Sequence, residues 1–265
     1  MSKVDNAQTV EQQYSDDKNL SIRISLHNKY STNKYGYSNW IFDFYQFFNG
    51  CKILELGCGN GIVWEKRINR LPVGTNLVLS DFSIGMVELV KEKFKGNSNV
   101  STEIIDIQEI GYSDNTFDIV IANSMLYHVP NLPKAVSEVY RVLKPNGKFY
   151  ASTTGVNGMT KYLHEKLKEF NPEIDAFGDD SFSFTLQNGN DILSSKFNNI
   201  NVYEYKDSLE ITETVDLISW ILSTNSMSEI DKSKIVGLDT FFGRCKDKNG
   251  IIKIPKQAGM FVAVK

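Results

Sequence analysis

The sequence is poor in the residues that mark disulfide-rich, metal-binding and membrane-spanning proteins. Its 265 residues include only three cysteines, Cys51, Cys58 and Cys245, and these form no spacing motif. We therefore expect no disulfide framework, and a reducing cytoplasm fits this composition. No cluster of His, Cys or Asp has the spacing of metal ligands, so no metal site is expected. No run of about 18 apolar residues occurs, which argues against a membrane-spanning helix.

The sequence also lacks a large excess of charge of either sign. Its formal net charge is −3 at pH 7, whereas general nucleic-acid binders usually present a basic surface. The stretch 1–6 has no apolar segment of the kind found in a secretory signal. A hydrophobic content of 41% and a charged content of 23% are ordinary for a globular protein. We expect a cytoplasmic protein that forms one large domain or a domain with a small cap.

The most informative stretch is a glycine-rich turn that follows a short apolar run. Residues 53–56 read Ile-Leu-Glu-Leu and residues 57–61 read G-C-G-N-G. Asp81 follows Gly61 by twenty residues, at the end of a second apolar run. Glycines let the backbone approach a ligand closely, and an acid at the end of the second strand can accept hydrogen bonds from ribose hydroxyls. This layout is typical of a nucleotide-binding βαβ unit.

Two details argue against a dinucleotide as the ligand of this turn. The glycines do not follow the G-x-G-x-x-G pattern, and Glu55 stands just before the turn, where it would repel a pyrophosphate. A ligand with a cationic centre and an amino-acid tail tolerates that carboxylate, and S-adenosylmethionine (SAM) has both. The segment Glu55–Gly61 resembles motif I of the class I SAM-dependent methyltransferases.

Further segments resemble that family in the family's order and cover about half of the chain. They are residues 81–83 after the second strand, 105–107 beside the adenine, 117–123 as the fourth strand, 126–129 as the loop after it, and 138–148 as the turn before the fifth strand. Repeated βα units predict an α/β fold with a doubly wound, Rossmann-like sheet. The resemblance adds a seven-stranded sheet with an antiparallel last strand, an N-terminal helical lid and helical insertions.

The resemblance assigns cofactor roles to individual residues. It implies that the backbone of Gly57, Cys58, Gly59 and Gly61 cradles the methionyl part of SAM and that Glu55 supports this end. The remaining implied contacts are Asp81 on the ribose hydroxyls, Phe82 and Ile107 packing on the adenine, Asp106 accepting from the adenine amino group, and Asn123 facing the sulfonium. Each polar residue has a structural alternative: bracing the loop for Glu55, capping a helix for Asp81, a solvated acid for Asp106, and a buried backbone-bonding amide for Asn123.

Catalytic residues are less clearly marked than cofactor residues. His128 is the best candidate for a general base, because imidazole titrates near neutral pH, and Tyr127 beside it is a second candidate. The alternative is that this loop uses both side chains for structure. In the N-terminal segment, Tyr14, Arg23 and Tyr30 lie outside a clear apolar stripe and are candidates, with His27, for a lid that contacts the cofactor. The alternative is a solvated, peripheral helix.

Apolar periodicity and turn residues divide the chain into expected elements. We expect a lid segment over 1–50, a SAM-binding core over 51–155, and substrate-side helices with the final strands over 156–265. Strands are expected at 52–56, 76–81, 100–105, 117–123, 148–153, 182–186, 201–205 and 259–265. Helices are expected at 20–35, 40–48, 61–70, 84–94, 132–143, 157–170, 190–197, 212–223 and 228–246.

These observations predict a SAM-dependent methyltransferase that acts on O, N or C of a small molecule. The motifs of enzymes that methylate nucleic-acid bases are absent, since Asn123-Ser124-Met125-Leu126 stands where the amino-methylating enzymes carry Asn-Pro-Pro-Tyr. The aromatic N-terminal and middle segments suit an apolar or ring-bearing acceptor. Two alternatives stay open: a methyltransferase fold that binds SAM or S-adenosylhomocysteine without transferring methyl, and an NAD-dependent oxidoreductase. The sequence does not indicate an oligomeric state.

Overall fold

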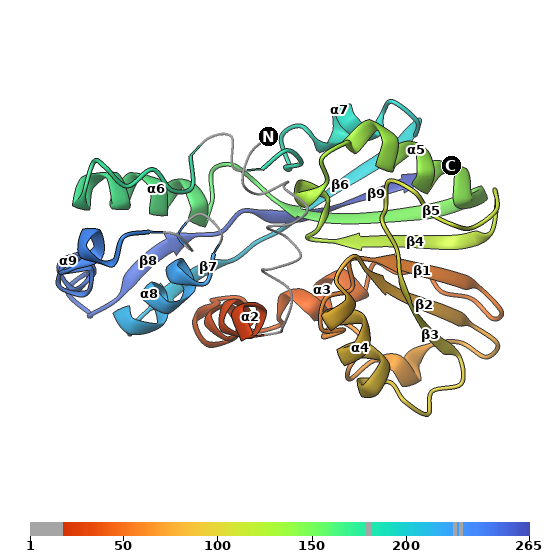
Figure 1. Ribbon diagram of the computed structural model, residues 1–265, viewed down its shortest axis with the longest axis horizontal. Helices are drawn as coiled ribbons and strands as arrows, with labels where there is room; N and C mark the ends of the chain where they lie inside the picture. The colour runs from red at the N-terminus through yellow and green to blue at the C-terminus, as the bar shows by residue number, and fades with distance from the viewer. Residues whose placement is uncertain (1–17, 179–181, 225–226, 228–229) are drawn as a thin grey trace.

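The computed structural model describes residues 18–178, 182–224, 227 and 230–265. Figure 1 shows a large sheet flanked by helices and, beside it, a smaller group of helices around a two-stranded sheet. Tyr14 and residues 228–229 of the helix expected at 228–246 lie outside the described residues. Within the described part, no helix is both long and apolar enough to cross a membrane.

The large sheet has seven strands in the order β3-β2-β1-β4-β5-β9-β6. The strands from β3 to β5 run parallel, and β9 pairs antiparallel with both β5 and β6. The expected doubly wound sheet with an antiparallel last strand is thus confirmed. The strand bounds are β1 Lys52–Leu56, β2 Asn76–Asp81, β3 Val100–Ile104, β4 Phe117–Asn123, β5 Leu143–Thr154, β6 Asn199–Tyr205 and β9 Ala258–Val264.

Both faces of the sheet are buried, which explains why its central strands are continuous apolar runs. Along β1, Leu54 and Leu56 face one core cluster and Ile53 faces another, because side chains alternate along a strand. Helix α4 (Ile84–Lys93) begins at Ser83, whose hydroxyl accepts from the Met86 N–H, as a helix N-cap does. The other helices beside the sheet are α3 Tyr37–Phe42, α5 Leu132–Val142 and α7 Gly189–Leu193, with 3₁₀ turns at Ile68–Arg70 and Leu126–His128.

A third core cluster lies in the smaller group of elements, on the left in Figure 1. Apolar residues alternate along its two paired strands, with Leu209 and Ile211 facing Ile252 and Ile254 in the buried layer. Its elements are α2 Lys18–Tyr30, α6 Met159–Phe170, β7 Ser208–Ile211, α8 Thr214–Leu222, the 3₁₀ turn Lys232–Ile235, α9 Leu238–Arg244 and β8 Ile252–Pro255. The sequence analysis did not anticipate the pair β7–β8.

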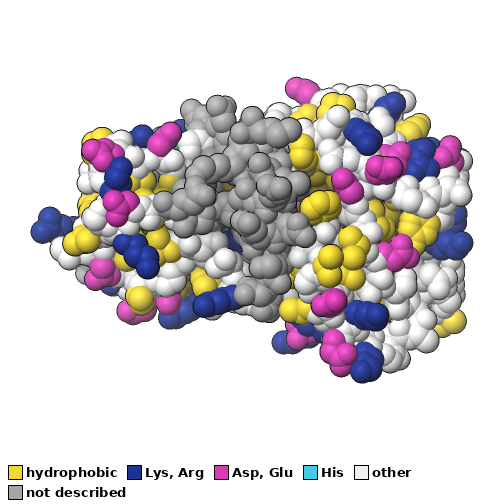
Figure 2. Space-filling model, viewed as in Figure 1, with side chains coloured by type: hydrophobic (Ala, Val, Ile, Leu, Met, Phe, Trp, Pro, Cys, Tyr) yellow, Lys and Arg dark blue, Asp and Glu magenta, His cyan; other side chains and the backbone are white. Residues whose placement is uncertain are grey.

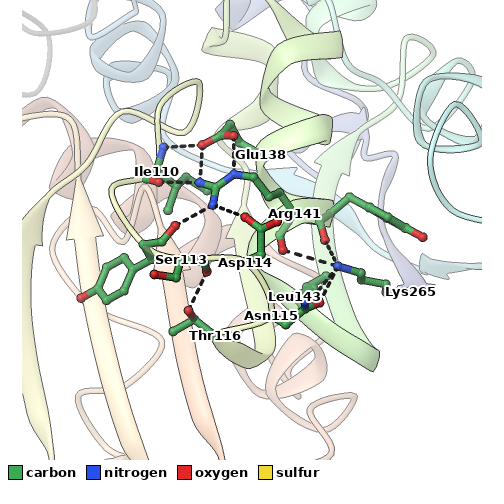
Figure 3. A network of polar contacts seen from close by, with 11 residues as sticks. Ile110, Ser113, Asp114, Asn115, Thr116, Glu138, Arg141, Leu143 and Lys265 are labelled. Carbon is green, nitrogen blue, oxygen red and sulfur yellow. Dashed lines mark hydrogen bonds and ion pairs between the residues drawn. The ribbon is translucent and has the colours of Figure 1, made fainter.

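A polar network fixes the loop that leads from β3 to β4 (Figure 3). Arg141 on α5 donates to the Ile110 carbonyl at 2.7 Å and to Asp114 at 2.9 Å, and pairs with Glu138 at 2.7 Å. Glu138 in turn accepts from the Ile110 N–H at 2.9 Å. Lys265 donates to the Leu143 carbonyl at 2.7 Å and to Asn115 at 3.0 Å. The loop that carries Asp106 is therefore held at both backbone groups of Ile110.

Three expected elements were wrong. Residues 61–67 form turns before the 3₁₀ segment Ile68–Arg70 instead of a helix over 61–70, because the Trp64 indole turns inward to bond Glu55. The helix expected over 40–48 begins at Tyr37 and ends at Phe42, since the aromatics after it pack in two directions, Phe44 on Tyr203 and Tyr45 on Trp64. Residues 182–186, all of them described, form no strand; a turn in which Asn188 accepts from the Thr185 N–H lies there.

Candidate cofactor site

The turn after β1 has a backbone that requires glycine. Gly57, Gly59 and Gly61 have φ angles of 68°, 54° and 71°, in the region that L side chains rarely adopt. A Cβ at Gly57 would lie 2.8 Å from the Met125 Cβ, and one at Gly59 would lie 3.3 Å from Leu20 on α2. The turn is thus closely packed against Met125 and helix α2, and only glycine fits its backbone.

Asp81 at the end of β2 holds this turn by hydrogen bonds to its backbone. One oxygen of its carboxylate accepts from the Gly59 N–H and the other from the Ser83 N–H, both at 2.9 Å. Burial raises the pKa of Asp81, and these backbone donors oppose the rise. Phe82 beside it is 40% exposed, an apolar ring at the rim of the site. Asp81 and the exposed ring of Phe82 therefore lie side by side next to the glycine turn.

Glu55 is the centre of a buried polar network beneath the turn. It is 1% exposed and accepts from the Trp64 indole and, at 2.8 Å, from the Asn123 amide. The Asn123 amide also donates to the Tyr45 hydroxyl at 2.8 Å, and its oxygen accepts from Ser152 at 3.1 Å. Burial raises the pKa of Glu55 to about 7, against the lowering effect of the two donors. A cationic ligand group nearby would favour the charged carboxylate.

Asp106 and Ile107 follow the end of β3 and differ in accessibility. Asp106 accepts from the Gln108 backbone N–H at 2.8 Å and from its side chain at 3.1 Å. Ile107 is 4% exposed and belongs to the core cluster on one face of the sheet. Its side chain is therefore in the core, and only its backbone remains to meet a ligand.

Tyr127 and His128 lie in the 3₁₀ turn after β4 and are both half-buried. Their rings meet edge to face with centroids 4.6 Å apart, and Tyr127 also contacts Phe182 at 4.7 Å. The His128 N–H donates to the Met125 carbonyl at 2.9 Å, and Met125 packs on Gly57. The turn with the two candidate catalytic residues therefore rests directly on the glycine turn.

Helix α2 places the lid candidates in different surroundings. Leu20 near its start packs close to Gly59, while Arg23 donates to the Asn19 carbonyl at 3.1 Å. Tyr30 is 5% exposed and its hydroxyl donates to Asp216 at 2.7 Å. Tyr30 is thus a residue of the third core cluster, away from the position expected of a cofactor contact.

Sequence reasoning missed Trp64 and Tyr45, which hold Glu55 and Asn123 in place. Both lie in segments that were expected to be helices, 61–70 and 40–48. Their chemistry could have indicated this role, because a buried indole or phenol needs a hydrogen-bond partner and Glu55 stands as a carboxylate in the neighbouring apolar run.

Comparisons with known proteins identify methyltransferases as relatives of this chain. Residues 54–151 match a family described as methyltransferase domain. A malonyl-[acyl-carrier protein] O-methyltransferase of Ilyobacter polytropus is 26% identical over 190 residues, 71% of each chain. A ubiquinone/menaquinone biosynthesis C-methyltransferase of Hydrogenovibrio crunogenus is 33% identical over 102 residues, 37% of this chain and 40% of the relative. The chain spans about half or less of the length of several relatives.

Two solved structures show the same fold in proteins that are named for different reactions. A Haemonchus contortus phosphoethanolamine N-methyltransferase in complex with S-adenosylhomocysteine aligns with a TM-score of 0.58 and 18% identity, over all of this chain and 60% of that chain. The [4+2]-cyclase SpnF aligns with a TM-score of 0.60 and 14% identity, over 98% of this chain and 96% of that chain. The chain therefore contains a methyltransferase domain over residues 54–151 with the Rossmann-like fold of SAM-dependent methyltransferases, and SAM is its cofactor.

Proposed function

We propose that this protein transfers the methyl group of SAM to O, N or C of a small-molecule acceptor. The observation that carries the proposal is the glycine turn clasped by Asp81, with the buried carboxylate of Glu55 directly beneath it. Such a turn fits the cofactor, because its three glycines hold positive φ angles and glycine lets the backbone approach a ligand closely. When bound, SAM supplies an electrophilic methyl group on a sulfonium.

Different residues of the site bind different parts of the cofactor. Asp81 holds the ribose hydroxyls, with Phe82 on the adenine and Asp106 at its amino group, while Glu55 supports the cationic end. The backbone of Gly57, Cys58, Gly59 and Gly61 cradles the methionyl part. The enzyme then needs mainly to align the acceptor and exclude water. Where the acceptor must lose a proton, His128 takes it, with Tyr127 beside it.

The chain is organised accordingly. Helix α2 covers the glycine turn through Leu20, residues 51–155 bind the cofactor, and residues 156–265 shape the acceptor side. Relatives named for a malonyl-[acyl-carrier protein] and for a quinone support small or carrier-held acceptors over nucleic acid. On the described part of the face in Figure 2, basic and acidic side chains are intermixed, which also favours a small molecule.

A second candidate is a protein that binds SAM or its product without methyl transfer. The alignment with a cyclase supports keeping it, since the same fold is found in a protein named for another reaction. Incubation with SAM labelled in its methyl group and a metabolite extract separates the two. The proposal expects label in a small-molecule product that the Asp81→Ala variant does not form. Cofactor binding without any labelled product favours the second candidate.

A further inference from the structure

Asp207 is a buried acid in the segment that joins β6 of the large sheet to β7 of the smaller group. Its side chain is fully buried and forms an ion pair with Lys256, which lies in the segment that joins β8 to β9. Its carboxylate also accepts from the Asn33 N–H at 2.9 Å and from the Ser31 hydroxyl, in the segment that joins α2 to α3. Three segments that connect the smaller group with the large sheet (Figure 1) therefore meet at one carboxylate.

The groups around Asp207 keep it charged. Burial would raise its pKa, but the hydrogen bonds from Lys256, Ser31 and the Asn33 N–H outweigh this effect, and the pKa lies below that of an ordinary aspartate. The Ser208 N–H donates to the same carboxylate at 2.9 Å. Lys256 is itself largely buried, with 12% of its side chain exposed, so a loss of Asp207 would leave a cation without its counter-charge. A buried carboxylate bonded on both oxygens fixes the segments that carry its partners.

Helix α2 runs from this carboxylate to the cofactor turn. Ser31 directly follows Tyr30, the last residue of α2, while Leu20 near the start of the helix packs 3.3 Å from the place of a Cβ at Gly59. Leu20 precedes Ser31 by eleven residues, which is about 16 Å of helix. A tilt of about 10° at Ser31 would therefore move Leu20 by about 3 Å, enough to lift it from the turn. The end of α2 that Asp207 holds thus decides whether Leu20 covers the glycine turn.

A second carboxylate bonds α2 within the smaller group. Asp216 on α8 accepts from the Tyr30 hydroxyl and from Lys29, both at 2.7 Å. Helices α2 and α8 contribute to the same core cluster, so this contact holds α2 to its own group. Asp207, in contrast, bonds segments that lead directly into β6 and β9 of the large sheet. The two acids hold one helix through different links, which makes them a matched pair for substitution.

We propose that Asp207 is a positioning residue that holds α2 against the glycine turn and so keeps Leu20 over the bound cofactor. Asp207 acts on the cofactor site of the proposed function, on which this inference rests, through the helix. A helix that covers a bound ligand excludes water from it and retains it. Loss of the Asp207 carboxylate should therefore weaken cofactor binding, although the residues assigned to bind the cofactor are unchanged.

Calorimetric titration with S-adenosylhomocysteine tests this in a double-mutant cycle of Asp207→Asn and Leu20→Ala. Asparagine keeps the shape of the side chain and an acceptor for the Asn33 N–H, but it removes the ion pair with Lys256. We expect each variant to weaken binding about tenfold, the size expected when burial of about two methylene groups is lost. The double variant should bind about as weakly as either single variant, because Asp207 acts through Leu20. Asp216→Asn, the matched control, should change the affinity by less than about twofold.

Several results overturn the proposal while leaving the cofactor site intact. They are an unchanged affinity in a folded Asp207→Asn variant, an equal loss in Asp216→Asn, losses that add in the double variant, and tighter binding in Leu20→Ala. If Asp207→Asn does not fold, Ser31→Ala, which keeps the ion pair, takes its place with an expected loss of about threefold and the same overturning results. A wild-type protein that binds no S-adenosylhomocysteine refutes the cofactor site, and with it the proposed function.

Discussion

Replacing Glu55 by glutamine should stabilise the protein and weaken its hold on SAM. Glu55 is 1% exposed, and burial raises its pKa from 4.5 to about 7. At 1.36 kcal/mol per unit, this shift corresponds to about 3 kcal/mol of folding free energy lost once the buried carboxylate is charged. Both states are protonated below pH 4.5, so the loss is absent there and grows as the pH rises toward 7. Glutamine resembles the neutral acid and avoids the loss.

The network around Glu55 can accept the amide. The glutamine oxygen can take the Trp64 N–H, and the Asn123 amide can turn over so that its oxygen accepts from the new amide nitrogen. The hydroxyls of Tyr45 and Ser152 can serve as donors or acceptors to the turned amide. The substitution therefore leaves no buried group unpaired.

The assay is urea unfolding of both proteins at pH 5 and pH 8, with calorimetric titration of SAM at pH 8. We expect the variant to gain up to about 3 kcal/mol in unfolding free energy at pH 8 and much less at pH 5. Its SAM affinity should fall by about 1.5–3 kcal/mol, the scale of an interaction with a charged group. A variant that is less stable at pH 8, or equally shifted at both pH values, would refute the burial argument. Unchanged SAM affinity would remove Glu55 from the cofactor site.

Three further substitutions test the site. Asp81→Ala should weaken SAM binding by about 1.5–3 kcal/mol in a folded protein, because a charged acceptor is lost. Calorimetry measures the SAM affinity and circular dichroism the fold, and an unchanged affinity contradicts the ribose role. Gly59→Val should abolish SAM binding, since φ of 54° excludes a branched side chain and Leu20 stands in the way; full affinity would show that the turn does not cradle ligand. His128→Asn should lower turnover by about 10²–10⁴-fold with SAM affinity retained, and near-normal turnover excludes a general base there.

The strands of the sheet were predictable because apolar runs and turn residues mark their positions in the local sequence. Strand β2 ends at Asp81 and β4 ends at Asn123, as expected from apolar runs that stop at polar residues. The cap of α4 at Ser83 was equally local. The N-terminal helix was also expected, over 20–35, and the structure confirms a helix there that begins at Lys18 and ends at Tyr30.

What the sequence did not predict depends on contacts between distant residues. Strands β7 and β8 are four residues each, and Leu209 meets Ile254 across more than forty residues of chain. The residues around Trp64 form turns instead of the expected helix, and the Trp64 indole donates to Glu55. Tyr30 was expected to contact the cofactor, but its hydroxyl donates to Asp216. In each case a buried polar or apolar partner elsewhere in the chain overrides the local pattern. The glycine turn was predictable because its requirement is local backbone geometry.

The most direct test of the account is whether the glycine turn binds SAM. Calorimetric titration of the purified protein with SAM, S-adenosylhomocysteine and NAD compares the candidate ligands under one condition. We expect one SAM or S-adenosylhomocysteine per chain, no binding of NAD, and a clear loss of SAM affinity in Asp81→Ala. Binding of NAD with no binding of SAM or S-adenosylhomocysteine would contradict the central claim.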